Sequence, residues 1–99
     1  MNFFQTEQLS NKYKKEIFQI WNNEYPEKIA FQTVENFEEY LSKLEKPNHY
    51  IIQNSKNKIS AWAVDFDRDN EKWFAIIVDQ NEQHKGLGKK LLLELQKHN

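Results

Sequence analysis

The sequence predicts an α+β fold, in which a short strand and two helices precede a mostly antiparallel sheet and a third helix follows it. Three observations support this prediction. Apolar residues recur at the helical spacing of three and four in the segments 10–24 and 33–46. Between 49 and 78 the pattern changes to that of strands separated by polar turns. Two glycines, Gly86 and Gly88, then lead into a helical segment rich in leucine.

In the first half of the chain, each helix has a residue typical of its start and a residue typical of its end. Ser10 and Thr33 stand where the side-chain oxygen of an N-cap residue would accept a free N–H of the following helix. Pro26 and Pro47 are expected to end the two helices, because a proline pushes the residue before it out of the helical conformation. A first short strand is expected over residues 1–6. The residues expected to face the core are Tyr13, Ile17, Ile20 and Trp21 in the first helix and Val34, Phe37, Leu41 and Leu44 in the second.

In the second half, three strands are expected over 49–53, 59–66 and 73–78. The turns between them are rich in Asn, Asp and Ser, and they are short, so the strands should form an antiparallel meander. The strand over 73–78 is almost continuously apolar, which is typical of a central strand. The aromatic residues expected in the core of this half are Trp62, Trp73 and Phe74.

Length and composition limit the classes of function. The chain has 99 residues, which is enough for one domain and not for two. A net charge of −1, from 14 basic and 15 acidic side chains, argues against nucleic acid or a membrane surface as partner. Without cysteine there is no disulfide or thiolate chemistry, and the three histidines share no ligand spacing, so no metal site is expected. No signal peptide or membrane span is apparent, so a cytoplasmic protein is expected.

The glycine turn carries the main indication of function. Gly86 and Gly88 open a helix directly after an apolar strand, and the first N–H groups of a helix have no intrahelical acceptor. Such a turn lets an anion approach the backbone, and the helix dipole favours it. Lys85, Lys89 and Lys90 add positive charge. The turn does not match a P-loop, which requires Ser or Thr after the lysine. Two plain turn glycines remain the alternative.

The residues Gln83-His84-Lys85-Gly86-Leu87-Gly88 match the Gln/Arg-x-x-Gly-x-Gly/Ala motif of the GCN5-related N-acetyltransferases, the GNAT family. The strand before the motif ends at Val78, five residues before Gln83, as is typical of that family. The order of the expected elements is also similar to the family's, and the resemblance extends over nearly the whole chain. It implies an acyl-CoA N-acyltransferase-like fold over residues 1–99.

The resemblance implies a coenzyme site and a reaction. Backbone N–H groups of the turn would bind the pyrophosphate of acetyl-CoA, and the end of the strand would align its pantetheine and polarise the thioester carbonyl. A primary amine, of a small molecule or a peptide, would attack the thioester directly. The cofactor-binding residues that the resemblance implies are Ile76, Ile77, Val78, Gln83, His84, Lys85, Gly86, Leu87, Gly88 and Lys89.

The chain departs from the family pattern in two respects. A complete member continues with another strand and helix, so the chain is expected to be an incomplete domain, and the strand over 71–78 is expected to leave an unpaired edge. A second copy of the chain is the expected partner at that edge, unless the chain is part of a longer gene product.

The second departure concerns the general base, for which histone-type members use a Glu on that strand. Lys72 stands at that position, and the adjacent Glu71 would lie on the opposite face. Asp65, Glu24 and Glu27 are weaker candidates, and a chain of water molecules is another, so no catalytic residue is assigned.

The function that the sequence predicts is therefore transfer of an acetyl group from acetyl-CoA to a primary amine. Two alternatives stay open. In the first alternative, the chain is a CoA-binding or vestigial domain without catalysis. In the second, it is a small α+β module for protein interaction.

Overall fold

The computed structural model describes residues 2–24, 33–83 and 85–97. The order of elements is the one that the sequence predicts, with one additional turn of 3₁₀ helix before the glycine turn. The elements are β1 (Asn2–Thr6), α1 (Asn11–Glu24), α2 (Val34–Ser42), β2 (Glu45–Gln53), β3 (Ile59–Arg68), β4 (Glu71–Val78), the 3₁₀ helix η1 (Gln80–Glu82) and α3 (Leu87–Lys97).

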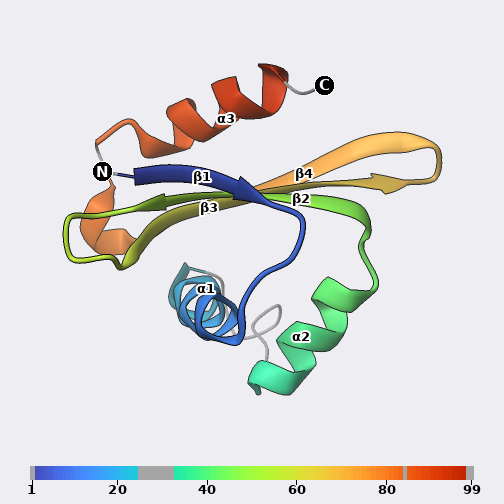
Figure 1. Cartoon of the computed structure of the whole chain (residues 1–99), viewed down its shortest axis with the longest axis horizontal. Helices are drawn as coiled ribbons and strands as arrows, with labels where there is room; N and C mark the ends of the chain where they lie inside the picture. The colour runs from blue at the N-terminus through green and yellow to red at the C-terminus, as the bar shows by residue number, and fades with distance from the viewer. Residues whose placement is uncertain (1, 25–32, 84, 98–99) are drawn as a thin grey trace.

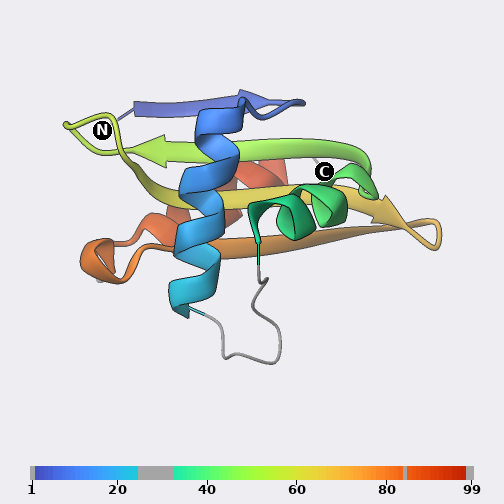
Figure 2. The same cartoon turned by 90° about the horizontal axis from the view of Figure 1, so that it is seen from below.

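The four strands form one sheet in the order β1-β2-β3-β4, and every neighbouring pair is antiparallel. The sheet is the middle layer of three (Figure 1): α3 covers one face, and α1 and α2 cover the other. From the side of α1 and α2, α1 crosses all four strands, while α2 lies beside it (Figure 2). The meander predicted from the short turns is therefore confirmed.

Two apolar clusters hold the layers together, because the two faces of the sheet carry side chains of different size. Trp62 and Val64 of β3 point toward α1 and α2, whereas Ala61 and Ala63 lie under α3 and let that helix approach closely. The buried residues of the first cluster are Ile17, Ile20, Trp21, Phe37, Leu41, Ile51, Ile59, Trp62, Val64 and Ile77. Those of the second are Tyr50, Ile52, Ala61, Ala63, Leu87, Leu91 and Leu95.

The predicted helix starts are confirmed. The Ser10 Oγ accepts the N–H of Tyr13 at 3.2 Å, and the Thr33 Oγ1 accepts the N–H of Asn36 at 3.1 Å. Each bond satisfies one of the donors that the first turn of a helix leaves without an acceptor.

The predicted end of the second helix is wrong. The helix ends at Ser42, five residues before Pro47, and Pro47 lies inside β2. Between Glu45 and Asn48 the register with β3 shifts, and Lys46 has a φ of 49°. A proline has no N–H to donate to the hydrogen-bond ladder between two strands. A register shift is a position where the ladder does not require that donor, so it can accommodate Pro47. The predicted end of the first helix, at Pro26, lies outside the described residues.

The strands β3 and β4 are longer than the predicted 59–66 and 73–78, because the turn between them has only two residues. Asp69 and Asn70 have φ values of 53° and 65°. Positive φ at both central residues is the requirement of the tightest hairpin turns, and Asp and Asn tolerate it. The hairpin therefore continues past the helices on both faces of the sheet (Figures 1 and 2).

Among the described strands, β4 is at the edge of the sheet, as expected of an incomplete domain and not as its apolar run suggests, and the predicted burial of its aromatic residues is wrong. Among the described residues, β4 pairs with β3 alone. Trp73 is 44% exposed and Phe74 is 53% exposed, because both stand on the part of the hairpin that none of the described helices covers. Trp62, the third aromatic residue expected in the core, is fully buried. The Arg68 guanidinium lies 5.5 Å from the centre of the Trp73 ring, where a cation–π contact shields one side of the indole.

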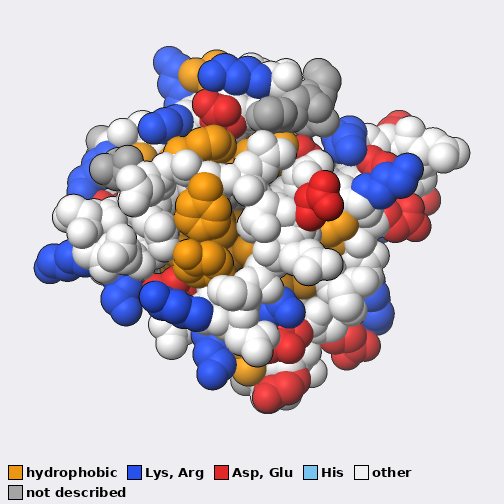
Figure 3. Space-filling view, in the orientation of Figure 1, with side chains coloured by type: hydrophobic (Ala, Val, Ile, Leu, Met, Phe, Trp, Pro, Cys, Tyr) orange, Lys and Arg blue, Asp and Glu red, His pale blue; other side chains and the backbone are white. Residues whose placement is uncertain are grey.

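On the surface, side chains of both charges are interspersed over the face in Figure 3, and apolar side chains gather where the layer of the sheet reaches the surface. None of the helices in the described part of the chain is long and apolar enough to cross a membrane.

Candidate functional site

The glycine turn and the end of β4 form the two sides of one pocket, with a volume of about 420 Å³. The end of α1 supplies a third side. The described residues that line it are Glu24, Ile76, Ile77, Val78, Glu82, Gln83, Gly86, Leu87 and Gly88. The pocket thus joins residues of α1 and of the turn that are about sixty positions apart in the sequence.

The N-terminus of α3 faces this pocket, and no side chain among the described residues caps it. Lys90 donates the first helical hydrogen bond, from its N–H to the Gly86 carbonyl at 3.0 Å. The N–H groups of Leu87, Gly88 and Lys89 precede it in the first turn, and such groups have no intrahelical acceptor. Gly86, at the N-cap position, has no side chain to accept from them. The residues that open α1 and α2 do have such a side chain, so α3 differs from both.

The two glycines differ in what the absence of a side chain provides at their positions. Gly86 has a φ of +74°, a conformation that other residues adopt only with strain, and a Cβ there would have no atom within 4 Å. Gly88 needs no unusual backbone conformation, and its Cβ would meet the Val78 Cγ2 at 3.7 Å, an ordinary contact. The turn therefore requires Gly86, whereas nothing in the packing requires Gly88. What a side chain at Gly88 would change is the space between the helix N-terminus and the end of β4.

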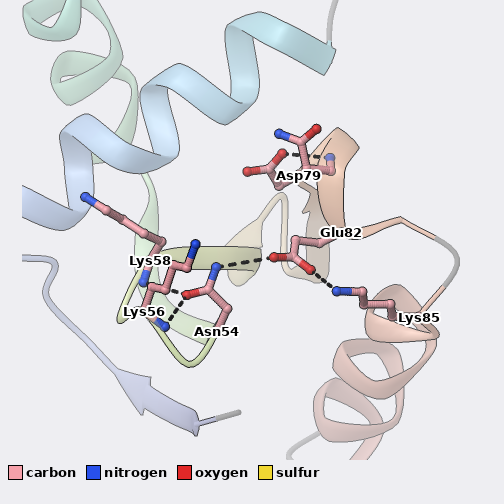
Figure 4. A network of polar contacts seen from close by, with 7 residues as sticks. Asn54, Lys56, Lys58, Asp79, Glu82 and Lys85 are labelled. Carbon is pink, nitrogen blue, oxygen red and sulfur yellow. Dashed lines mark hydrogen bonds and ion pairs between the residues drawn. The ribbon is translucent and has the colours of Figure 1, made fainter.

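Hydrogen bonds to other parts of the sheet fix the segment before the turn. The N–H of Asp79 donates to the Ser60 carbonyl at 2.8 Å, which continues the pairing of β4 with β3. Asn54, in the turn between β2 and β3, donates from Nδ2 to the Glu82 Oε1 at 3.2 Å (Figure 4). The Lys85 ammonium bonds the other oxygen of Glu82. Lys85 and Asn54 hold the pKa of the Glu82 carboxyl below its usual value.

Helix α1 holds the same segment from the other side. The Gln80 Nε2 donates to the Asn23 carbonyl at 2.9 Å, and the Gln83 Nε2 donates to the Glu24 Oε2 at 3.1 Å. The other oxygen of Glu24, Oε1, is buried and has no hydrogen-bond partner among the described residues. Glu24 thus brings one unsatisfied carboxylate oxygen to the wall of the pocket.

Of the candidates for a general base, Glu24 is the one that the described residues place in this pocket. The Asp65 carboxylate is buried under α3, where it accepts from the Tyr50 hydroxyl at 2.6 Å and from the Asn48 Nδ2 at 3.3 Å. The Lys72 ammonium forms an ion pair with Asp67 at 2.7 Å, and this hydrogen bond raises the pKa of Lys72. A lysine so paired stays charged and has no lone pair with which to accept a proton.

Most of the residues that the sequence predicts for the coenzyme site lie together in the pocket. They are Ile76, Ile77, Val78, Gln83, Gly86, Leu87 and Gly88. Lys89 is not among the residues that line it, although its N–H belongs to the first turn of α3. Lys85 is bound to Glu82, so its charge is partly neutralised. His84 and the candidate base Glu27 lie outside the described residues.

Glu82 lines the pocket but is not among the predicted residues. Its sequence position, directly before the motif, gives no sign of its contact with Asn54, which is 28 residues away. For Glu24, the only sequence signal is an acidic residue near the expected end of a helix.

By sequence, no family model matches the chain, and no curated protein matches it either. By structure, it is similar to three acetyltransferase chains. The first is the GCN5-related glucosamine N-acetyltransferase region of a fungal multi-domain β-N-acetylglucosaminidase, with a TM-score of 0.78 and 17% identity, over 98% of this chain and 12% of that one.

The second similar structure is an aminoglycoside 6′-N-acetyltransferase in complex with coenzyme A, with a TM-score of 0.76 and 13% identity, over 99% of this chain and 54% of that one. The third is a candidate phosphinothricin N-acetyltransferase, with a TM-score of 0.74 and 17% identity, over 97% of this chain and 63% of that one. This chain thus spans less than two thirds of the length of each. The structural similarity to these three acetyltransferases shows that the chain has the fold of the GCN5-related N-acetyltransferases.

Proposed function

We propose that the chain binds acetyl-CoA across the glycine turn and the end of β4, and transfers the acetyl group to a primary amine. The observation that carries the proposal is the pocket shared by an apolar strand end and a helix N-terminus that no described side chain caps. The N–H groups of the first turn of α3 suit a pyrophosphate, because they are unsatisfied donors at the positive end of the helix dipole.

The strand side of the pocket suits the rest of the coenzyme. Beyond Val78 the chain turns away, and alternate backbone groups of β4 point away from β3, where no strand among the described residues pairs with them. An amide-containing chain such as pantetheine can bond these groups as a further strand would. One of the similar structures is itself a complex with coenzyme A.

For the reaction, the chain would supply position and charge rather than a covalent intermediate. The neutral amine nitrogen forms a bond to the thioester carbon, and the bond from that carbon to sulfur breaks. The nitrogen loses one proton, and the leaving sulfur takes up one proton, so that the products are the amide and CoA as the thiol. Holding both reactants in one pocket removes much of the entropic barrier, and a backbone N–H of β4 directed at the carbonyl oxygen would stabilise the developing negative charge.

Isothermal calorimetry with acetyl-CoA tests the coenzyme site, with an equal concentration of inorganic pyrophosphate as a comparison. Binding should be saturable, and acetyl-CoA should raise the melting temperature of the chain. Release of free thiol with a panel of primary amines then tests transfer. Binding without thiol release would favour a CoA-binding domain that does not catalyse. Absence of binding would favour the interaction module and overturn the proposal.

A further inference from the structure

Glu82 is an unexpected residue in a pocket that is proposed to bind an anion. It lines the pocket together with Gly86 and Gly88 of the glycine turn, and its side chain is only 13% exposed. Lys85 and Asn54 hold the pKa of its carboxyl below the usual value, so the group is ionised at neutral pH. Two negative charges repel each other, and the repulsion is stronger where water is scarce. The carboxylate therefore opposes a phosphate unless another group balances its charge.

Lys85 balances the charge of Glu82 from outside the pocket. Its ammonium bonds the Glu82 Oε2, and its side chain is 52% exposed. Lys85 is not among the described residues that line the pocket, and these include no Lys, Arg or His. The lysine thus lies on the solvent side of the carboxylate. From there it neutralises one wall of the pocket without itself being part of that wall.

Asn54 gives the Glu82 carboxylate a structural role. The Asn54 Nδ2 donates to the Glu82 Oε1 at 3.2 Å, so each carboxylate oxygen has a partner (Figure 4). The Asn54 Oδ1 accepts the N–H groups of Lys56 and Lys58, at 2.8 and 3.1 Å. The same amide therefore closes the turn between β2 and β3 and holds the segment that leads into the glycine turn. That segment is thus tied to the sheet, which is a rigid support for a binding site.

We infer that Asn54, Glu82 and Lys85 are positioning residues for the phosphates of the coenzyme. Asn54 fixes Glu82, Glu82 fixes the entry to the glycine turn, and Lys85 removes the charge that Glu82 would otherwise present to the ligand. Lys85 thus promotes binding through Glu82 and not by contact with the phosphates, although its place in the motif suggests such a contact. The inference rests on the proposed function for the identity of the anion.

The first test is a double-mutant cycle on Glu82 and Lys85, in which calorimetry gives Kd for acetyl-CoA and for inorganic pyrophosphate. Lys85→Gln leaves an unbalanced carboxylate beside the ligand and should raise both Kd values about five- to tenfold. Glu82→Gln removes that charge but still offers Asn54 an acceptor, so its Kd values should equal those of the unaltered protein or be lower. In the Glu82→Gln background, Lys85→Gln should change Kd by less than about twofold.

Lys97→Gln is the matched control for this cycle. Lys97 forms an ion pair with Glu94 at 3.2 Å, also three residues away, with side chains that are 67% and 19% exposed, but at the other end of α3. The variant removes the same unit of charge and should leave both Kd values unchanged. An equal loss in Lys97→Gln would make net charge the cause. No loss in Lys85→Gln, or a loss that persists in the Glu82→Gln background, would also overturn the inference.

The second test reverses the hydrogen bond between Asn54 and Glu82. Asn54→Asp keeps the acceptor for the two N–H groups of its own turn but replaces the donor with a carboxylate oxygen, so it should raise both Kd values about tenfold. Adding Glu82→Gln supplies an amide that donates in the opposite direction, and Kd should return to the value of Glu82→Gln alone. Thermal melting without ligand verifies that each variant is folded. A loss that Glu82→Gln does not relieve would overturn the inference, because Asn54 would then not act through Glu82.

The two ligands separate this inference from the proposed function. If pyrophosphate binds with the expected dependence on Glu82 and Lys85 but acetyl-CoA does not bind, the proposed function fails and the anion site with its positioning residues stands. If acetyl-CoA binds but the cycle shows no coupling between Glu82 and Lys85, the inference fails and the proposed coenzyme site stands. If neither ligand binds the unaltered protein, both are overturned.

Discussion

Replacing Gly88 with alanine should make the protein at least as stable and yet a weaker binder of acetyl-CoA. The new Cβ would meet the Val78 Cγ2 at 3.7 Å, which is ordinary contact, and the backbone at Gly88 is not in the left-handed region. Because alanine is favoured over glycine in a helix by about 0.8–1 kcal/mol, the free energy of unfolding should stay equal or rise by up to about 1 kcal/mol. For a domain of this size that corresponds to a rise in melting temperature of up to about 8 °C.

The same methyl group should weaken coenzyme binding. It would occupy the space between the first turn of α3 and the end of β4, through which the proposed site would admit an anion to the N–H groups. Loss of one hydrogen bond to a charged group costs about 1.5–3 kcal/mol, which corresponds to an increase in Kd of about 10- to 150-fold. Calorimetry with acetyl-CoA gives Kd, and thermal melting without ligand gives the stability.

Gly86→Ala separates the two glycines. Its Cβ would point into open space, but a residue other than glycine at a φ of +74° costs about 1–2 kcal/mol. We expect this variant to melt at a lower temperature than Gly88→Ala. If Gly88→Ala binds acetyl-CoA with unchanged affinity, the ligand does not approach the backbone there, and the assignment of the turn is wrong. If Gly88→Ala melts well below the unaltered protein, the account of its packing is wrong.

Three further predictions concern the rest of the fold. Burial lowers the pKa of His49 from 6.5 to about 4, so the unfolded chain takes up the proton first. In urea titrations, stability should be full above pH 6.5 and fall by about 1.4 kcal/mol per unit toward pH 4, a slope that His49→Gln should lack. Tyr50→Phe removes the 2.6 Å hydrogen bond to the buried Asp65 and should lower the free energy of unfolding by about 1–3 kcal/mol. The control variant Tyr13→Phe should not show this loss. Finally, we propose that two copies pair through the outer edge of β4, where Phe74 is exposed. Light scattering after size exclusion should give the mass of a dimer for the unaltered chain and that of a monomer for Phe74→Lys. The mass of a monomer at every concentration of the unaltered chain would exclude this pairing.

The helices and their starts could be predicted from the sequence because the signals are local. Ser10 and Thr33 lie within three residues of the N–H groups that they satisfy. The turn at Asp69 and Asn70 was recognisable by composition for the same reason. Its length was not, because two, three and four residues of this kind are all compatible with a hairpin, and the register of the whole strand pair decides among them.

The position of β4 in the sheet could not be read from its own residues. A continuous apolar run such as 73–78 is typical of a strand with neighbours on both sides, but the run does not say which neighbours exist. The exposure of Trp73 and Phe74 follows from where the helices end, which is a property of the three layers together. Pro47 was misleading for a similar reason, since a proline ends a helix and also suits an irregular strand, and the local sequence is compatible with both.

In the candidate site, too, local features could be predicted from the sequence, and contacts between distant residues could not. Gly86 and Gly88 were recognisable because an anion-binding turn depends on a few adjacent residues. The pairing of Gln83 with Glu24 was not, because 59 positions separate them and only the packing of α1 against the sheet brings them together. Asn54 and Asn23 hold the intervening segment in the same way, from a hairpin turn and from a helix end. Because these contacts fix the segment 80–83 before any ligand binds, little conformational entropy of that segment remains to be lost on binding. The motif therefore supplies the donors, and the distant contacts determine what else shares the pocket with them, which is the property that would distinguish this chain from others with the same turn.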